Sequence, residues 1–153
     1  MTTGDTSDLL TAVAIACGRD LKVGEFDDRL TLQKGCYILN SWGYGPRYHF
    51  NMYIRGPYSS DLAKEHHKYG TIAGRETDVP EEALSRLAEI FSKGTGYAEA
   101  YATVLMIRSN SKDASKEDVL KRAMDLKPRL KAEVAEAAAC LLSRSTSIPA
   151  ASS

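Results

Sequence analysis

Apolar residues recur at helical spacing along most of this chain. The three-to-four-residue interval is clear over residues 6–17, 27–42, 81–93, 97–108, 115–126 and 128–142. Side chains at this spacing share one face of an α-helix, so the pattern predicts amphipathic helices in these segments. A shorter helix is expected from Ser59 or Ser60 to about Tyr69. The fold class that follows is mainly α, with about seven helices in a single domain.

The helix predicted at 27–42 has an unusual distribution of apolar side chains. One stripe consists of Leu32, Cys36 and Leu39, and a second of Leu30, Tyr37 and Ile38. A helix that is apolar on two flanks is expected in the centre of a fold. Arg29 and Gln33 lie between the stripes, and a partly buried slot there would require polar partners for them.

One short stretch changes to a period of two. The side chains of Tyr48, Phe50, Met52 and Ile54 alternate with those of His49, Asn51, Tyr53 and Arg55. This alternation predicts one β-strand with the first set facing the core. Gly56 and Pro57 are expected to end the strand, because proline has no N–H to donate. Residues 71–77 are the best candidate for its partner, which predicts a short β-hairpin or winged-helix-like element.

Length and composition narrow the class of protein. A chain of 153 residues is expected to form one domain, 1–153, with disordered tails at 1–5 and 144–153. No apolar run approaches the roughly 18 residues of a membrane span. The three cysteines are far apart in sequence, which argues against a disulfide framework and indicates a cytoplasmic location. The net charge of zero gives no overall electrostatic reason to bind nucleic acid.

No catalytic or metal-binding pattern is legible in the sequence. Cys36 lies on an apolar stripe, where a free cysteine is usually inert. His66 and His67 are adjacent, so on a helix their side chains point about 100° apart and cannot chelate one ion together. Gly94 and Gly96 are not followed by the lysine of a phosphate-binding loop. We therefore expect no enzyme activity, no metal and no cofactor.

The most distinctive stretch lies between Phe26 and Tyr69, which holds nine of the twelve aromatic residues and all three histidines. Within it stand Arg29, Leu32-Gln33-Lys34, Tyr37, Leu39, Gly43, Tyr48, Phe50, Tyr53, Gly56-Pro57-Tyr58-Ser59 and Leu62. This order resembles the YwgA-like group of bacteria and archaea, whose function is unknown and which is similar to the Panacea domain of SocA-type antitoxins. The resemblance covers about 35 residues. It implies a compact helical domain which, in the antitoxin members, neutralises a partner protein or delivers it to a protease.

The same stretch supplies the candidate binding residues for a partner or ligand: Arg29, Gln33, Lys34, Tyr37, Tyr53, Arg55, Gly56, Pro57, Tyr58 and Ser59. In one interpretation they form a groove that docks a protein, such as a toxin or another client. In the other they are structural, with Arg29 and Gln33 bonded to backbone groups of the turn after the strand. Residues 55–58 are expected to adjoin an exposed apolar patch if the first interpretation holds.

The distribution of charge leaves two further alternatives open. Residues 108–131 contain eight basic and four acidic side chains, whereas residues 76–99 contain two basic and six acidic ones. Such a dipolar chain can form a self-complementary homodimer. The basic segment can also belong to a winged-helix-like regulator that binds nucleic acid, although the sequence favours a protein partner. Solvated helix faces explain the same charges.

Overall fold

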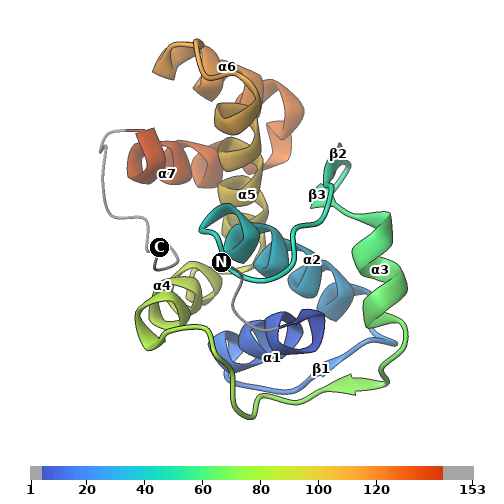
Figure 1. Cartoon of the computed structure of the whole chain (residues 1–153). Helices are drawn as coiled ribbons and strands as arrows, with labels where there is room; N and C mark the ends of the chain where they lie inside the picture. The colour runs from blue at the N-terminus through green and yellow to red at the C-terminus, as the bar shows by residue number, and fades with distance from the viewer. Residues whose placement is uncertain (1–4, 143–153) are drawn as a thin grey trace.

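The computed structural model describes residues 5–142, and within that range it is mainly helical. Seven α-helices follow one another within residues 5–142: α1 (Thr6–Cys17), α2 (Phe26–Ser41), α3 (Ser60–His66), α4 (Glu81–Ser92), α5 (Thr95–Asn110), α6 (Lys116–Leu126) and α7 (Lys131–Leu142). A 3-10 turn, η1 (Pro128–Leu130), joins the last two. The predicted fold class is confirmed (Figure 1). Of the predicted tails, residues 1–4 and 143–153 lie outside the described range, and Asp5 caps α1.

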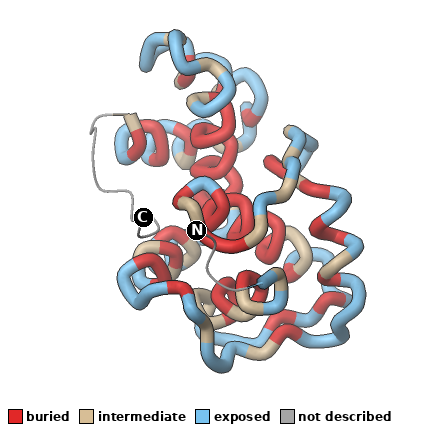
Figure 2. Tube along the Cα trace, in the orientation of Figure 1, coloured by how far each residue is buried: buried red, intermediate tan, exposed pale blue. Residues whose placement is uncertain are grey.

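Helices α2 and α5 form the centre of the molecule. Helix α2 contacts α1, α3, α4 and α5, while α5 also contacts α6 and α7. Every residue from Thr31 to Asn40 and from Tyr97 to Ile107 is buried (Figure 2). Figure 1 shows α6 and α7 at one end of α5, with α1 and α4 toward the other. The prediction that the second helix, α2, lies at the centre of the fold is thus confirmed.

The β structure of the described part of the chain consists of two separate two-stranded sheets. Strand β1 (Leu21–Lys22) pairs with β4 (Thr71–Ile72), and β2 (Asn51–Tyr53) pairs with β3 (Gly56–Tyr58), both antiparallel. The partner expected for the aromatic strand was therefore wrong. Residues 71–72 do form a strand, but they bind the segment before α2, while the aromatic strand pairs with the residues that directly follow it.

Gly56 and Pro57 do not end the β structure but form its second strand. Met52 faces Pro57 across the hairpin, and Ile54 and Arg55 make the turn. A sheet of two strands has only edge strands, where a residue without an N–H is tolerated. Gly56 has φ +101°, a conformation that glycine adopts without strain. Ile54 belongs to the turn, so its side chain is 82% exposed rather than inward-facing as the alternation predicted.

Candidate functional site

Gln33 fastens the chain that follows the hairpin to the central helix. Its side chain is fully buried. The amide Nε2 donates to the Ser59 carbonyl at 3.0 Å, and Oε1 accepts from the Ser59 N–H at 2.8 Å. One side chain thereby binds both backbone groups of Ser59; the carbonyl also accepts from Ala63 N–H at 3.0 Å, so it is the buried Ser59 N–H that depends on Gln33. Ser59 is itself the N-cap of α3, where its side chain accepts from Leu62 N.

The same amide fixes the state of a buried histidine. Gln33 Nε2 lies 3.2 Å from His66 Nε2. The bonds to Ser59 assign the amide nitrogen to this position, so Gln33 donates and His66 Nε2 accepts. His66 is therefore neutral. Burial, with smaller contributions from His67 and Arg29, lowers its pKa to about 4.

Arg29 has a different structural role from the one expected. Its Nη1 donates to the Val23 carbonyl at 2.8 Å, and its guanidinium lies 5.7 Å from the centre of the Phe26 ring. These contacts hold the segment that leads into α2. Arg29 does not bond to the segment after the strand. Of the two residues, only Gln33 does so.

Lys34 is buried without a counter-ion. It is 4% exposed, and its amine makes no hydrogen bond or ion pair with any residue from 5 to 142. Burial lowers the pKa of this amine to about 8; Glu99 opposes the shift, whereas Lys127 and Arg55 add to it. A charged amine in this position lowers the stability of the fold, because the attraction of Glu99 compensates only part of the lost hydration.

Behind Lys34 lies an ion pair that the sequence did not reveal. Lys127 and Glu99 are 4% and 6% exposed, with Lys127 Nζ 3.1 Å from Glu99 Oε2. Lys127 also donates to the carbonyls of Tyr53 and Ile54. The angles at Glu99 Oε2 are not those of a hydrogen bond, so the contact is one of opposite charges. This pair ties the end of α6 to α5 and to the hairpin.

One signal for the ion pair was present in the sequence. Glu99 is the only acidic residue between Tyr97 and Ile107, in a helix buried on every side. A carboxylate in such a helix requires a cation. Its partner, Lys127, directly precedes Pro128, where the chain leaves α6. The end of the helix at this point is legible in the sequence, whereas the burial of the lysine is not.

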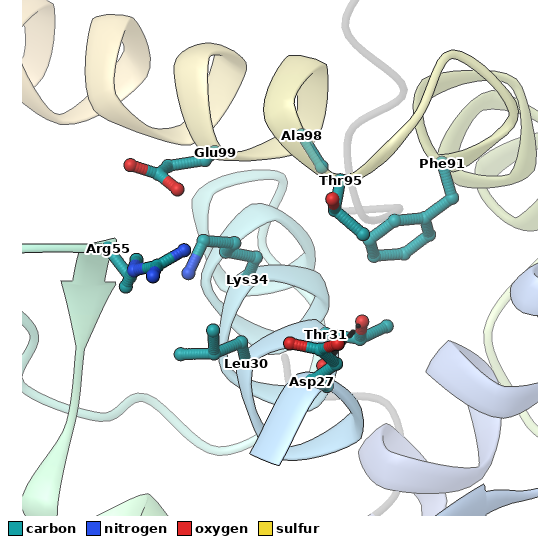
Figure 3. A pocket seen from close by; sticks show the side chains of 9 residues that line it. All are labelled: Asp27, Leu30, Thr31, Lys34, Arg55, Phe91, Thr95, Ala98 and Glu99. Atoms are coloured by element: carbon teal, nitrogen blue, oxygen red, sulfur yellow. Dashed lines mark hydrogen bonds between the residues drawn. The ribbon is translucent and has the colours of Figure 1, made fainter. Parts of the chain in front are cut away.

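A small recess and an open groove meet at Lys34. The recess has a volume of about 50 Å³ and is lined by Asp27, Leu30, Thr31, Lys34, Arg55, Phe91, Thr95, Ala98 and Glu99. Figure 3 shows Lys34 and Arg55 pointing toward one another, with Glu99 on α5 nearby. The groove is larger, about 410 Å³, and is lined by Phe26, Leu30, Lys34, Tyr53, Ile54, Arg55, Gly56, Tyr58 and Ser60. Leu30, Lys34 and Arg55 belong to both.

Large apolar side chains surround this groove and remain exposed. Phe26 is 54% exposed, Tyr53 48% and Ile54 82%. The rings of Tyr53 and Tyr58 pack edge to face with their centres 5.6 Å apart. These residues come from the start of α2 and from the hairpin. An exposed apolar patch thus lies beside Arg55 and Tyr58, as the protein-docking interpretation requires.

Apart from Arg29, which binds the Val23 carbonyl before α2, the predicted site residues fall into three groups. Lys34, Tyr53, Arg55, Gly56 and Tyr58 line the groove. Gln33 and Ser59 form the buried fastening behind it, and Pro57 is buried in β3. Tyr37 faces a different cavity, where its ring packs edge to face on Phe50 at 5.1 Å and burial raises its pKa to about 12. Tyr37 is therefore not part of the groove.

Comparisons with known protein families, sequences and structures identify no relative of this chain. No family model matches the chain, and no curated protein and no solved structure matches it. The resemblance to the YwgA-like and Panacea group stays a prediction that rests on the residues between Arg29 and Leu62.

Three further observations concern the described part of the chain. Within residues 5–142, no group of three or more His, Cys, Asp or Glu side chains is arranged to hold a metal ion. Cys36 is completely buried, and burial raises the pKa of its thiol. No helix in the same range combines the length and the apolar character needed to cross a membrane.

Proposed function

We propose that this chain is a cytoplasmic protein-interaction module that docks a partner protein in the groove between the start of α2 and the β2–β3 hairpin. The observation that carries the proposal is the exposed apolar rim of that groove, made by Phe26, Tyr53 and Ile54. Aromatic and aliphatic side chains that surround a depression are typical of protein-binding sites. No reaction is part of the proposed function.

The rim is held rigidly, which favours binding. Lys127 binds the backbone carbonyls of Tyr53 and Ile54 at the tip of the hairpin. Gln33 binds Ser59 directly after the hairpin. A surface fixed from both ends loses little conformational entropy when a partner binds, so more of the interaction energy appears as affinity.

The resemblance to SocA-type antitoxins suggests one kind of partner. In that case the client is a toxin, and the chain neutralises it or acts as an adaptor that presents it to a protease. The groove accounts for either role through the same contact. Co-expression of the client with this chain is then expected to restore growth, and the Ile54→Asp variant is expected not to.

A charge placed in the rim tests the proposal. Ile54→Asp is expected to abolish stoichiometric capture of a protein from nuclease-treated lysate, since an apolar contact at the rim would have to bury a carboxylate. Tyr69→Asp serves as the matched control, because Tyr69 is 37% exposed and does not line the groove. The captured protein is then purified, and binding of both variants is measured by calorimetry. Equal binding by both variants would contradict the proposal.

The described structure gives less support to the nucleic-acid alternative. Lys127, one of the eight basic residues of 108–131, is buried against Glu99 and does not contribute to a basic surface. On α7, exposed Glu136 pairs with Lys93 of the region after α4. Recovery of nucleic acid rather than protein in the capture experiment would favour this alternative. A homodimer through the groove is a third outcome, recognised by light scattering.

A further inference from the structure

We infer that the recess at Lys34 and Arg55 binds the side-chain carboxylate of an acidic residue in the partner, while apolar residues beside that acid occupy the groove. The inference deepens the proposed function and rests on it. It specifies the chemistry of the docked segment: an aspartate or glutamate flanked by apolar residues.

The first reason is the imbalance of charge around the recess. Two cations, Lys34 and Arg55, and two carboxylates, Asp27 and Glu99, line the recess, and Lys127 beside Glu99 adds a third cation. Glu99 is already in contact with Lys127, at 3.1 Å. Neither Lys34 nor Arg55 has an anionic partner within the described residues. Two like charges that point toward one another repel, and an anion between them would convert this repulsion into two attractions (Figure 3).

The second reason is the burial of Lys34. A lysine that is 4% exposed almost always has a paired charge. Its amine is directed into a recess that adjoins the groove, since Leu30, Lys34 and Arg55 line both. Asp27, Thr31 and Thr95 line the same recess, and Figure 3 shows Asp27 away from the Lys34 amine. The position opposite the amine is thus open to a ligand group.

Size decides which anion fits. A space of roughly 10–15 Å³ holds one water molecule, so the recess of about 50 Å³ accepts a small planar group such as a carboxylate. The fork of Arg55 suits the two oxygens of a carboxylate. The recess is narrow, so it suits the carboxylate of one side chain on a segment that lies in the groove. It suits the C-terminal end of a chain less well. The exposed rim of the groove favours a macromolecule over a small acid, which would leave Ile54 uncovered.

The test uses the full chain and a library of random internal peptides displayed on phage. Selection on the wild type, with removal of binders to Lys34→Met, is expected to enrich peptides with Asp or Glu beside apolar residues. Binding of the enriched peptide is then measured by fluorescence anisotropy. Replacing its acid by the amide is expected to weaken binding about tenfold or more, the loss typical of a charge-assisted bond. Arg55→Met is expected to weaken it similarly, whereas Arg75→Met, an exposed control, is not.

Stability provides a second readout that a purely structural lysine would not give. Because Lys34 is buried and unpaired, Lys34→Met is expected to raise the melting temperature while it removes peptide binding. A lower melting temperature with unchanged binding would overturn the inference. Enrichment of peptides without an acid, or no enrichment over Lys34→Met, would overturn it as well. Selection of free C-terminal carboxylates from a second library, and not of internal acids, would refute the side-chain assignment.

The outcomes separate this inference from the function on which it rests. If Ile54→Asp abolishes capture of the partner and Lys34→Met does not, the groove is a docking surface and the carboxylate assignment fails. If neither substitution affects capture, the docking function itself fails.

Discussion

At the scale of single residues, Gln33 shows how a buried polar group serves structure beside a candidate site. The oxygen of its amide accepts from the Ser59 N–H. The nitrogen of the same amide donates to the Ser59 carbonyl and to His66 Nε2. The sequence predicted that a polar residue between two apolar stripes needs partners. The structural interpretation had Gln33 bonded to backbone groups after the strand, and its bonds to Ser59 agree with that. The sequence did not identify His66, which is more than thirty residues away along the chain.

We expect Gln33→Ala to lower the free energy of unfolding by about 1–3 kcal/mol, because it leaves the buried N–H of Ser59 unpaired and removes one of the two bonds to its carbonyl. Gln33→Glu is the sharper variant. It keeps an acceptor for the Ser59 N–H but has no donor for the Ser59 carbonyl, so it should also be destabilising. Urea denaturation measures both. An unchanged unfolding curve for Gln33→Ala would refute the structural role.

At the scale of elements, the hairpin, α5 and the end of α6 are joined by Lys127 and Glu99. Each side chain alone would be a buried charge in a region of low polarity. Together they compensate each other, and the two backbone carbonyls occupy the remaining donors of the lysine. The hairpin therefore depends on a residue that lies more than seventy positions further along the chain.

Lys127→Met is expected to destabilise the protein by about 3–5 kcal/mol, because Glu99 is left buried without a counter-charge. The double variant Lys127→Met, Glu99→Met should be more stable than Lys127→Met, since it removes both charges. Chemical denaturation of the two single variants and the double variant gives the coupling energy. Simple additivity of the two single effects would show that the ion pair does not stabilise this junction.

At the scale of the whole molecule, one core joins the helices, and His66 introduces a dependence on pH into it. The unfolded histidine titrates near pH 6.5, whereas burial keeps His66 neutral in the folded protein down to about pH 4. Between these values the unfolded chain binds a proton that the folded chain does not. The stabilising contribution is present above about pH 6.5 and is lost as the pH falls.

The free energy of unfolding should thus fall with decreasing pH, with a contribution from His66 of up to about 1.4 kcal/mol per pH unit between pH 6.5 and 4. His66→Asn should flatten this slope, and His67→Gln, which changes the exposed neighbour, should retain it. Thermal unfolding at a series of pH values provides the comparison. Parallel slopes in the wild type and His66→Asn would rule out this role for His66.

Local pattern predicted those features of the candidate site that depend on neighbours in sequence. The clustering of Lys34, Tyr53, Arg55, Gly56 and Tyr58 was expected from their common stretch, and these residues do line one groove. Tyr37 shared that stretch and faces another cavity, because the rotation of α2 turns it toward Phe50. The strand partner was mispredicted because period-two alternation does not reveal that a two-residue turn at Ile54 and Arg55 reverses the chain.

What the sequence by itself determined is the helical architecture and the central place of α2, because both follow from the periodic spacing of apolar side chains within one segment. Only the tertiary structure decided which buried charges meet. Glu99 and Lys127 are distant in sequence but form an ion pair, whereas Lys34 forms none with any described residue. Which charged residues pair depends on distances across the fold. The periodic spacing of apolar residues gives no information about these distances. For this reason the groove was anticipated from its residues, whereas the charged recess at its end was not.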